Sequence, residues 1–258
     1  MKFLSVFLSC LSFSVAIFAD SPPRHVPPEL YEEFTMEGRV PVIEWYLYEP
    51  GSVDHPTVFR QSLINEYIQV VQRKGHGYYG VNLDRWLYQA LERYPIAGKE
   101  VGIIGSTLPF YESVVLAYGG KPITVEYNKI VSEDPRITTY TVDEFNENPR
   151  KFDVILSISS IEHDGLGRYG DPINPNADLE FMTKAKSLLK EGGHMILAVP
   201  VGRDVLIWTA CRVYGSIRLP LLLKEWNLID SFGFSEKDFT SGALGNYVHQ
   251  PIFYLEPK

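Results

Sequence analysis

Apolar runs alternate with amphipathic segments along residues 98–258, and the segment 152–201 shows this pattern most clearly. It opens with FDVILSIS, whose apolar residues and small serines are typical of a strand buried on both faces. Apolar residues then recur at helical spacing from Phe181 to Leu189, and we expect the pair Gly192-Gly193 to end that helix. A second apolar run, MILAVPV, follows. A strand, a crossover helix and a parallel strand form a right-handed unit, so this segment predicts a parallel sheet.

The same alternation continues on both sides of that segment. Strands are predicted over residues 101–104, 123–127, 137–141, 154–159 and 195–199, with a closing antiparallel pair over 226–231 and 251–255. Helices are predicted over 59–72, over 111–118, and from a cap at Asn82 to the residue before Pro95. This succession predicts an α/β fold with a doubly wound, mostly parallel sheet and helices on both faces.

The first residues have the composition of a secretory signal peptide. Lys2 precedes a run of apolar residues and serines, and Ala19 stands before a polar, proline-rich stretch. Because a membrane span needs roughly 20 apolar residues, this run is short for one. We therefore expect residues 1–19 to be removed and the protein to enter the secretory pathway, secreted or lumenal. Anchoring to the membrane by residues 3–19 is the alternative.

Residues 20–97 are predicted to form an N-terminal arm and helices that cap the α/β domain of residues 98–258. The first part of this extension is rich in proline and aromatic residues and has little periodicity. Cys211 is the only cysteine outside the predicted signal peptide, so an intramolecular disulfide is excluded in the mature chain. Its apolar surroundings in the sequence favour a buried thiol over a nucleophile.

The 258 residues carry a net charge of −8 at pH 7 and contain no long basic stripe. This balance argues against nucleic acid as a partner. With 45% hydrophobic residues the chain can bury a full core. No later segment is apolar enough to span a bilayer, so no stable membrane span is expected after signal cleavage. The oligomeric state is left open by the sequence.

The order of these elements resembles the class I methyltransferases that use S-adenosylmethionine. The likeness covers about residues 101–255 and is best in FDVILSISSIEH, which ends in Glu162 and His163, and in LLKEGGHMILAVPV. These stretches are similar to the fourth strand of that family and to the glycine turn before its fifth strand. The whole chain also resembles a nematode family of unknown function with a predicted methyltransferase-like, Rossmann-type fold.

The resemblance implies a site for S-adenosylmethionine at the carboxyl ends of the strands, where open α/β sheets place their ligands. Gly105 lies in the turn after the first strand, where a missing side chain lets the backbone approach a ligand. Glu126 ends the second strand and can accept both ribose hydroxyls, and Asp143 resembles the polar contact to the adenine amine. The expected cofactor-binding residues are Gly105, Ser106, Glu126, Asp143, Ser159 and Ser160.

The turn after the first strand departs from the family pattern. That family usually has an acidic residue two positions before the first glycine, and a run of alternating glycines. Here the acidic position is Ile103, and the later glycines are replaced. A contact to the amino group of the cofactor is therefore missing. Ser106 and Thr107 can form hydrogen bonds instead, whereas Leu108 and Pro109 narrow the turn.

His163 is the candidate catalytic residue, because a neutral imidazole can accept a proton from a hydroxyl that attacks a methyl sulfonium. A loop histidine bonded to backbone is the alternative. Candidate substrate-binding residues lie around the glycine-rich loop GLGRYG and after the fifth strand: Glu162, Asp164, Asp171, Arg212 and Tyr214.

No zinc or calcium motif has the spacing of these acidic and histidine residues, so no metal site is predicted. The expected activity is methyl transfer to an oxygen of a small-molecule or glycan substrate. The alternative is a catalytically inactive, methyltransferase-like binding module of the secretory pathway.

Overall fold

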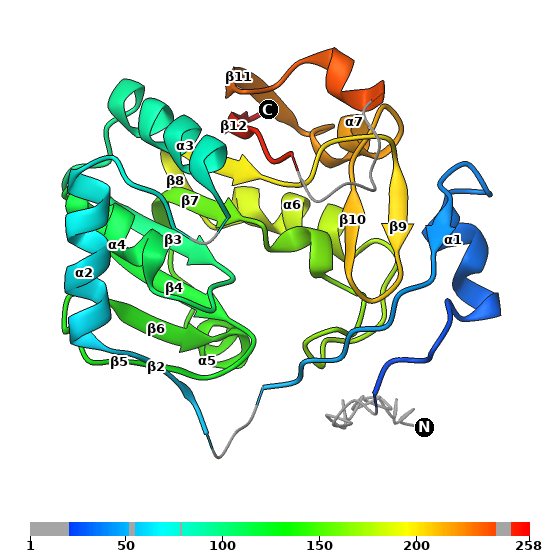
Figure 1. Cartoon of the computed structure of the whole chain (residues 1–258), viewed down its shortest axis with the longest axis horizontal. Helices are drawn as coiled ribbons and strands as arrows, with labels where there is room; N and C mark the ends of the chain where they lie inside the picture. Colours follow the sequence, from blue (N-terminus) through cyan, green and yellow to red (C-terminus); the bar gives the residue numbers. More distant parts are fainter. Residues whose placement is uncertain (1–20, 52–54, 78, 241–248) are drawn as a thin grey trace, which may run out of the picture.

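A seven-stranded sheet lies at the centre of the protein, with strand order β11-β12-β8-β7-β3-β4-β6 (Figure 1). The computed structural model describes residues 21–51, 55–77, 79–240 and 249–258, so the predicted signal peptide lies outside the described residues. The strands of the sheet are β3 (Glu100–Ile104), β4 (Lys121–Glu126), β6 (Thr138–Thr141), β7 (Phe152–Ile158), β8 (Leu189–Ala198), β11 (Trp226–Phe232) and β12 (Ile252–Pro257).

The strand order confirms the predicted doubly wound sheet. The neighbouring pairs from β6 to β8 are all parallel, whereas β12 is antiparallel to both β8 and β11. From β3 the chain moves outward through β4 to β6, then returns to β7 on the other side of β3. The winding therefore reverses between β3 and β7, and open α/β sheets bind ligands at such a reversal.

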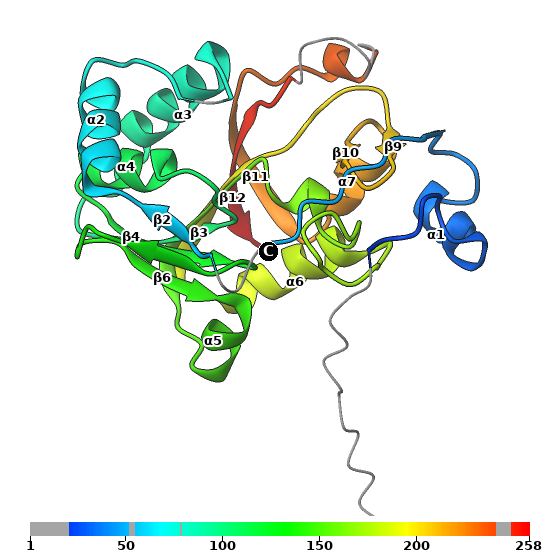
Figure 2. The same cartoon turned by 60° about the horizontal axis from the view of Figure 1, so that its bottom comes forward.

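Helices cover both faces of the sheet, as Figure 2 shows. One face carries α2 (Gln61–Gln72), α3 (Val81–Arg93) and α4 (Phe110–Ala117), and the other carries α5 (Val142–Glu147), α6 (Ala177–Ser187) and α7 (Arg218–Leu222). The strands are apolar on both sides: Val154 and Leu156 pack with the first set of helices, and Ile155 packs with the second. This double burial is the physical reason for the continuous apolar runs in the sequence.

The amphipathic helix predicted from Asn82 is α3, which buries Leu83, Leu87 and Leu91. The predicted cap was wrong. The N-cap residue is Gly80, and Asn82 lies inside the first turn, where its amide oxygen accepts a hydrogen bond from Arg85 at 3.0 Å. An asparagine in the first turn can thus resemble a cap in sequence while bonding only to a neighbouring side chain.

The glycine pair at Gly192-Gly193 does not end a helix, contrary to the sequence-based prediction. Helix α6 already ends at Ser187, and the pair lies within β8. The register between β7 and β8 shifts there: Phe152 pairs with Leu189, but the next paired residue, Val154, is opposite His194. Gly192 has φ +70° at this irregularity, a conformation that favours glycine.

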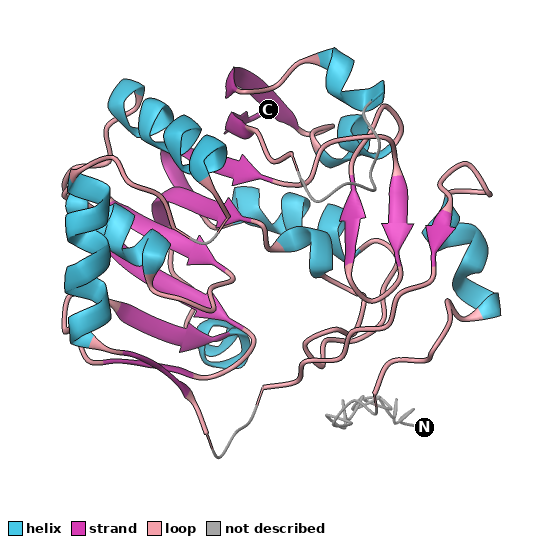
Figure 3. Ribbon diagram, viewed as in Figure 1, coloured by secondary structure: helices cyan, strands magenta, loops and turns pink. Residues whose placement is uncertain are grey.

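The N-terminal segment packs beside the sheet, away from α2 and α3. Its short elements are η1 (Pro28–Leu30), α1 (Tyr31–Thr35) and β1 (Val42–Ile43), and β1 pairs with β9 (Val205–Ile207), which pairs in turn with β10 (Cys211–Val213). Phe34 packs edge-on against the buried ring of Trp208, with ring centroids 5.3 Å apart. After β1, residues 44–51 have no regular secondary structure, as Figure 3 shows.

Farther along the chain, β2 (Thr57–Phe59) pairs with β5 (Ile130–Ser132), and β5 contacts β6 of the main sheet. Helix α3 shares one hydrophobic core with the sheet, through contacts that include Leu87 and Val101. The division into an arm with capping helices and an α/β domain stays a prediction. In the part of the chain that the structure describes, no helix is long and apolar enough to cross a membrane.

Candidate functional site

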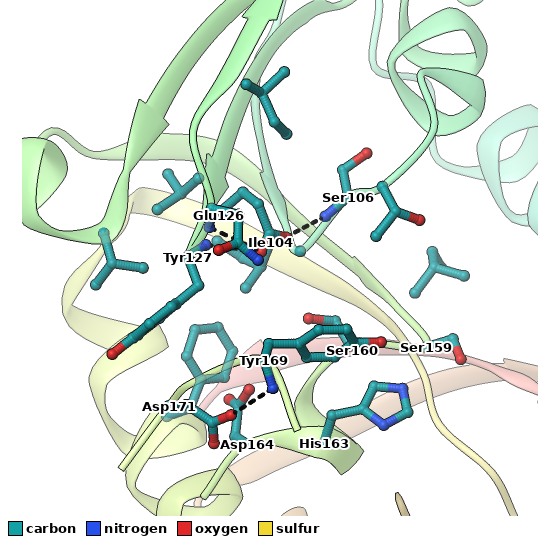
Figure 4. Close-up of a pocket in the computed structure, with 18 of the residues that line it drawn as sticks. Ile104, Ser106, Glu126, Tyr127, Ser159, Ser160, His163, Asp164, Tyr169 and Asp171 are labelled. Atoms are coloured by element: carbon teal, nitrogen blue, oxygen red, sulfur yellow. Dashed lines mark hydrogen bonds between the residues drawn. The ribbon is translucent and has the colours of Figure 1, made fainter. Parts of the chain in front are cut away.

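A cavity of about 430 Å³ opens where β3, β4 and β7 end (Figure 4). This volume lies within the range of small-molecule sites, roughly 300–1,000 Å³. Each strand end contributes to the lining: Gly105 and Ser106 after β3, Glu126 at the end of β4, and Ser159 with Ser160 after β7. The cavity therefore lies at the reversal in strand order, as predicted for a doubly wound sheet.

Glycine is required at position 105 by two features of the turn. Its φ is +73°, in the left-handed region, and a Cβ atom there would lie 2.1 Å from the hydroxyl oxygen of Ser160. The turns after β3 and β7 can approach this closely only because Gly105 has no side chain. Leu108 lines the cavity and is 39% exposed, whereas Pro109 precedes α4 and is absent from the lining. The altered turn thus leaves the cavity open.

The carboxylate of Glu126 is held by backbone amides. Its Oε2 accepts a hydrogen bond from the amide of Ser106 at 2.7 Å, and its Oε1 accepts one from Tyr127 at 2.8 Å. Burial raises the pKa of Glu126, and these backbone hydrogen bonds oppose the rise. A carboxylate has about four acceptor positions, so Glu126 keeps capacity for a ligand hydroxyl.

Ser159 has φ +50°, an uncommon conformation for a residue other than glycine, at the edge of the cavity. Its hydroxyl donates to Glu162 Oε1 at 2.7 Å and accepts from the side-chain amide of Gln250 at 3.1 Å. Glu162 is 1% exposed, and burial raises its pKa to about 7. Glu162 does not line the cavity, which corrects its prediction as a substrate contact. Through this hydrogen bond Glu162 holds the hydroxyl of Ser159 in position.

His163 lines the cavity, as expected for a catalytic residue, and it also contacts the backbone, as expected for a loop histidine. The geometry fits both hypotheses in part. Its Nδ1 lies 2.5 Å from the carbonyl oxygen of Ala210. A carbonyl only accepts, so this nitrogen carries the hydrogen and Nε2 keeps its lone pair. Nε2 lies 3.7 Å from Glu162 Oε1. Burial lowers the pKa of His163 to about 4, so the imidazole is neutral near pH 7.

Asp171 organises the glycine-rich loop at the cavity wall. Its carboxylate accepts hydrogen bonds from the amides of Gly165 at 2.7 Å, of Gly167 at 3.2 Å and of Tyr169 at 3.2 Å. The loop in turn contacts the N-terminal segment, because the guanidinium of Arg168 pairs with Glu49 at 2.7 Å. Asp171 therefore lines the cavity and also stabilises the turn, as the loop sequence suggests.

Arg212 and Tyr214 lie behind the cavity wall and do not line it, which corrects the prediction that they contact substrate. They are 2% and 0% exposed. The guanidinium of Arg212 donates to the backbone oxygen of Asp164 at 2.6 Å, and the hydroxyl of Tyr214 donates to Asp178 at 2.9 Å. Internal partners thus occupy both polar groups.

Asp143 is exposed in the first turn of α5 and is absent from the lining, although its neighbour Val142 lines the cavity. Its contact to an adenine amine stays a prediction. Cys211 is partly exposed rather than fully buried, and burial raises the pKa of its thiol to about 12. A thiol with this pKa is a weak nucleophile. Within the described ranges, no group of three or more His, Cys, Asp or Glu side chains could hold a metal ion.

Residues 98–247 match the family described as "Caenorhabditis protein of unknown function, DUF268". The chain belongs to this family. A comparison with curated proteins gave no match.

Solved structures that resemble this member of the family include methyltransferases. The N1-methyltransferase for 1,6-didemethyltoxoflavin from Burkholderia thailandensis is 17% identical over 66% of this chain and 75% of its own, with a TM-score of 0.48. The ribosomal protein L11 methylase of Lactobacillus delbrueckii subsp. bulgaricus is 12% identical over 70% of this chain and 81% of its own, with a TM-score of 0.43. The class I methyltransferase-like fold of this protein is assigned from its own strand order rather than from these similarities.

Aromatic residues form much of the cavity wall, and the sequence analysis missed them. They are Tyr79, Phe110, Tyr111, Tyr127, Phe145, Tyr169 and Phe181. Tyr127 directly follows Glu126, so its place after a strand end was a usable signal. Tyr79 comes from the segment before α3, and it stacks on Tyr111 with ring centroids 6.3 Å apart. No local pattern links that segment to the strand ends.

Proposed function

We propose that this protein binds S-adenosylmethionine and transfers its methyl group to an oxygen of a small-molecule or glycan substrate. The observation that carries the proposal is the convergence of Gly105, Glu126 and Ser159 on one cavity at the reversal in strand order. These residues come from three adjacent strand ends, and doubly wound sheets bind nucleotides at this place.

The residues that line the cavity fit an adenosyl ligand. Gly105 keeps the turn free of a side chain, Glu126 presents a buried carboxylate for hydroxyl groups, and aromatic rings form an apolar wall. When bound, the cofactor supplies an electrophilic methyl group on a sulfonium. Ser159 and Ser160 would lie at the cofactor's methionine end, and Gly105 and Glu126 at its ribose.

The residues of the cavity can assist the transfer by alignment and by proton acceptance. Holding two reactants in line contributes most of the rate in such a reaction. His163 is neutral near pH 7 and has a free lone pair at Nε2, so we assign it the role of proton acceptor from the substrate hydroxyl. The predicted signal peptide would place this activity in the secretory pathway, where the cofactor must be imported from the cytosol. No role for nucleic acid is proposed.

Calorimetric titration with S-adenosylmethionine and S-adenosylhomocysteine tests the proposal without knowledge of the acceptor. Wild-type protein is expected to bind both, and Glu126→Ala is expected to weaken both by more than tenfold because a buried acceptor of ribose hydroxyls is lost. The matched control is Glu147→Ala, which removes an exposed carboxylate of α5 that does not line the cavity.

Absence of binding at millimolar ligand would reject the enzyme and favour the alternative, an inactive binding module with the same fold. Unchanged affinity in Glu126→Ala would remove Glu126 from the cofactor site while leaving the methyltransferase proposal in place.

A further inference from the structure

The side chain of Asp164 lines the cavity and makes no hydrogen bond or ion pair with any described residue. Only its backbone is engaged: the carbonyl oxygen accepts from Arg212 at 2.6 Å, and the amide donates to the carbonyl of Ile161 at 3.2 Å. The other carboxylates of this region differ, because Asp171 accepts three backbone amides and Asp178 is paired with arginine. A half-buried carboxyl without a protein partner, inside a cavity, is available to a ligand.

The charges around Asp164 favour a cation in the cavity. Burial raises the pKa of Asp164 well above its ordinary range, and the carboxylates of Asp171, Asp178 and Glu162 add to the rise, whereas Arg212 opposes it. His163, its neighbour in the chain, is neutral near pH 7. A cation placed against Asp164 would lower its pKa again, so binding would release a proton from this carboxyl.

The rest of the lining is compatible with a positive charge. Among the described residues of the lining, Lys184 is the only lysine or arginine, and its Nζ already donates to the amide oxygen of Asn146 at 2.9 Å. Tyr127 and Tyr169 present aromatic rings, which tolerate or attract cations at their faces. Figure 4 shows Asp164 and Asp171 on one side of the cavity, opposite Glu126 and Ser106.

The turn after β3 contributes no carboxylate of its own, because residues 103–109 contain no acidic residue. Asp164 offers one from the segment after β7, the strand adjacent to β3 in the sheet.

We propose that Asp164 binds a primary ammonium group inside this cavity. The ammonium belongs either to the amino-acid end of the cofactor or to an amine-bearing acceptor. The first source rests on the proposed function, and the second requires only the cavity.

The first arm of the test compares S-adenosylhomocysteine with 5′-methylthioadenosine, which keeps the nucleoside and lacks the amino-acid end. Calorimetry in buffers of different ionisation enthalpy counts the protons released on binding. For a cofactor ammonium, S-adenosylhomocysteine releases more protons on binding than methylthioadenosine does, because only the former places a cation against Asp164. Asp164→Asn then weakens S-adenosylhomocysteine by tenfold or more and leaves methylthioadenosine within about twofold.

The second arm titrates the protein, with and without S-adenosylhomocysteine, with pairs of ligands that differ in one group: tyramine against tyrosol, and glucosamine against glucose. For an acceptor ammonium, the amine of a pair binds at least tenfold more tightly than its neutral partner. Asp164→Asn removes that preference, and Glu147→Gln retains it. If the Asp164→Asn variant fails to fold, the number of protons that wild-type protein releases when the amine binds serves as the second measurement.

The outcomes separate the two proposals. Binding of S-adenosylhomocysteine without proton release, together with no amine preference that depends on Asp164, overturns the role of Asp164 and leaves the methyltransferase proposal standing. No binding of either nucleoside overturns the methyltransferase proposal. In that case an amine preference lost in Asp164→Asn still supports the ammonium site, and its absence overturns it as well.

Discussion

Asp164 and Asp178 both lie close to Arg212, but the pKa of one carboxyl is raised and that of the other is lowered. Asp178 is 0% exposed, accepts Arg218 Nε at 2.9 Å and the hydroxyl of Tyr214 at 2.9 Å, and lies 3.9 Å from Arg212 Nε. Burial alone would raise the pKa of Asp178, but the arginines and Tyr214 outweigh it and hold the pKa below its ordinary value. Asp164 receives no such donors, and its pKa is raised.

The two residues are of the same type, and they differ in the number of partners that their carboxylates have. A buried carboxylate with complete hydrogen bonding is part of the scaffold, because its charge is compensated inside the protein. A carboxyl that faces a cavity without a partner is compensated only when a ligand arrives. Asp178, Arg212, Tyr214 and Arg218 therefore form a structural cluster, whereas the carboxyl of Asp164 belongs to a candidate binding site.

Removing one member of the structural cluster is expected to give the largest effect. Arg218→Met leaves the buried charge of Asp178 without its bidentate partner and removes one of the two hydrogen bonds to the carbonyl of Pro175, which Arg212 still donates to at 3.2 Å. The free energy of unfolding, measured by urea denaturation, should fall by about 3–5 kcal/mol.

The matched control is Lys186→Met, which removes a more exposed ion pair with Glu225 and should change stability by less than about 1 kcal/mol. Equal effects of the two substitutions would contradict the distinction between a buried scaffold cluster and ordinary surface pairs.

Glu162 is intermediate between the fully hydrogen-bonded Asp178 and the unpartnered Asp164. Ser159 donates to one of its oxygens, and the other oxygen has no partner among the described residues. Its pKa is raised from 4.5 to about 7. The native state therefore binds the proton more tightly than the unfolded chain, and the associated stability is full below about pH 4.5 and lost as the pH rises through 7.

Glu162→Gln removes this dependence. Relative to the variant, wild-type protein should lose roughly 3 kcal/mol of unfolding free energy between about pH 5 and pH 8, because one pKa unit corresponds to about 1.4 kcal/mol. Urea denaturation of both proteins at the two pH values measures this. A difference that stays constant with pH would show that Glu162 is fully compensated, like Asp178.

The smallest effect is expected at Glu49, whose carboxylate pairs with Arg168 at the loop that carries Asp164. The Glu49 side chain is 53% exposed, and the backbone amide of Glu49 also donates to the carbonyl of Arg168 at 2.7 Å. Glu49→Gln should therefore lower the free energy of unfolding by only about 0.5 kcal/mol. A loss above about 1.5 kcal/mol would instead show that this ion pair fixes the loop at the cavity.

The fold was predictable from the sequence because its signals are local. Apolar runs and helical spacing depend on residues close together in the chain, and they located the seven strands of the central sheet. Gly105, Glu126 and Ser159 could be chosen as site residues for the same reason, since each directly follows or ends a predicted strand, and the structure places all three in the cavity lining.

What only the tertiary structure decided was which polar groups find partners. Arg212 and Tyr214 are internal because Asp178 and the backbone at Asp164, more than thirty positions away, receive their hydrogen bonds. The place of Gly192 within a strand likewise depends on the register with β7. Burial and hydrogen bonding between distant segments set these outcomes. Two residues of the same type therefore differ in role: Asp178 is part of the internal hydrogen-bond network, whereas the carboxyl of Asp164 has no partner and faces the cavity.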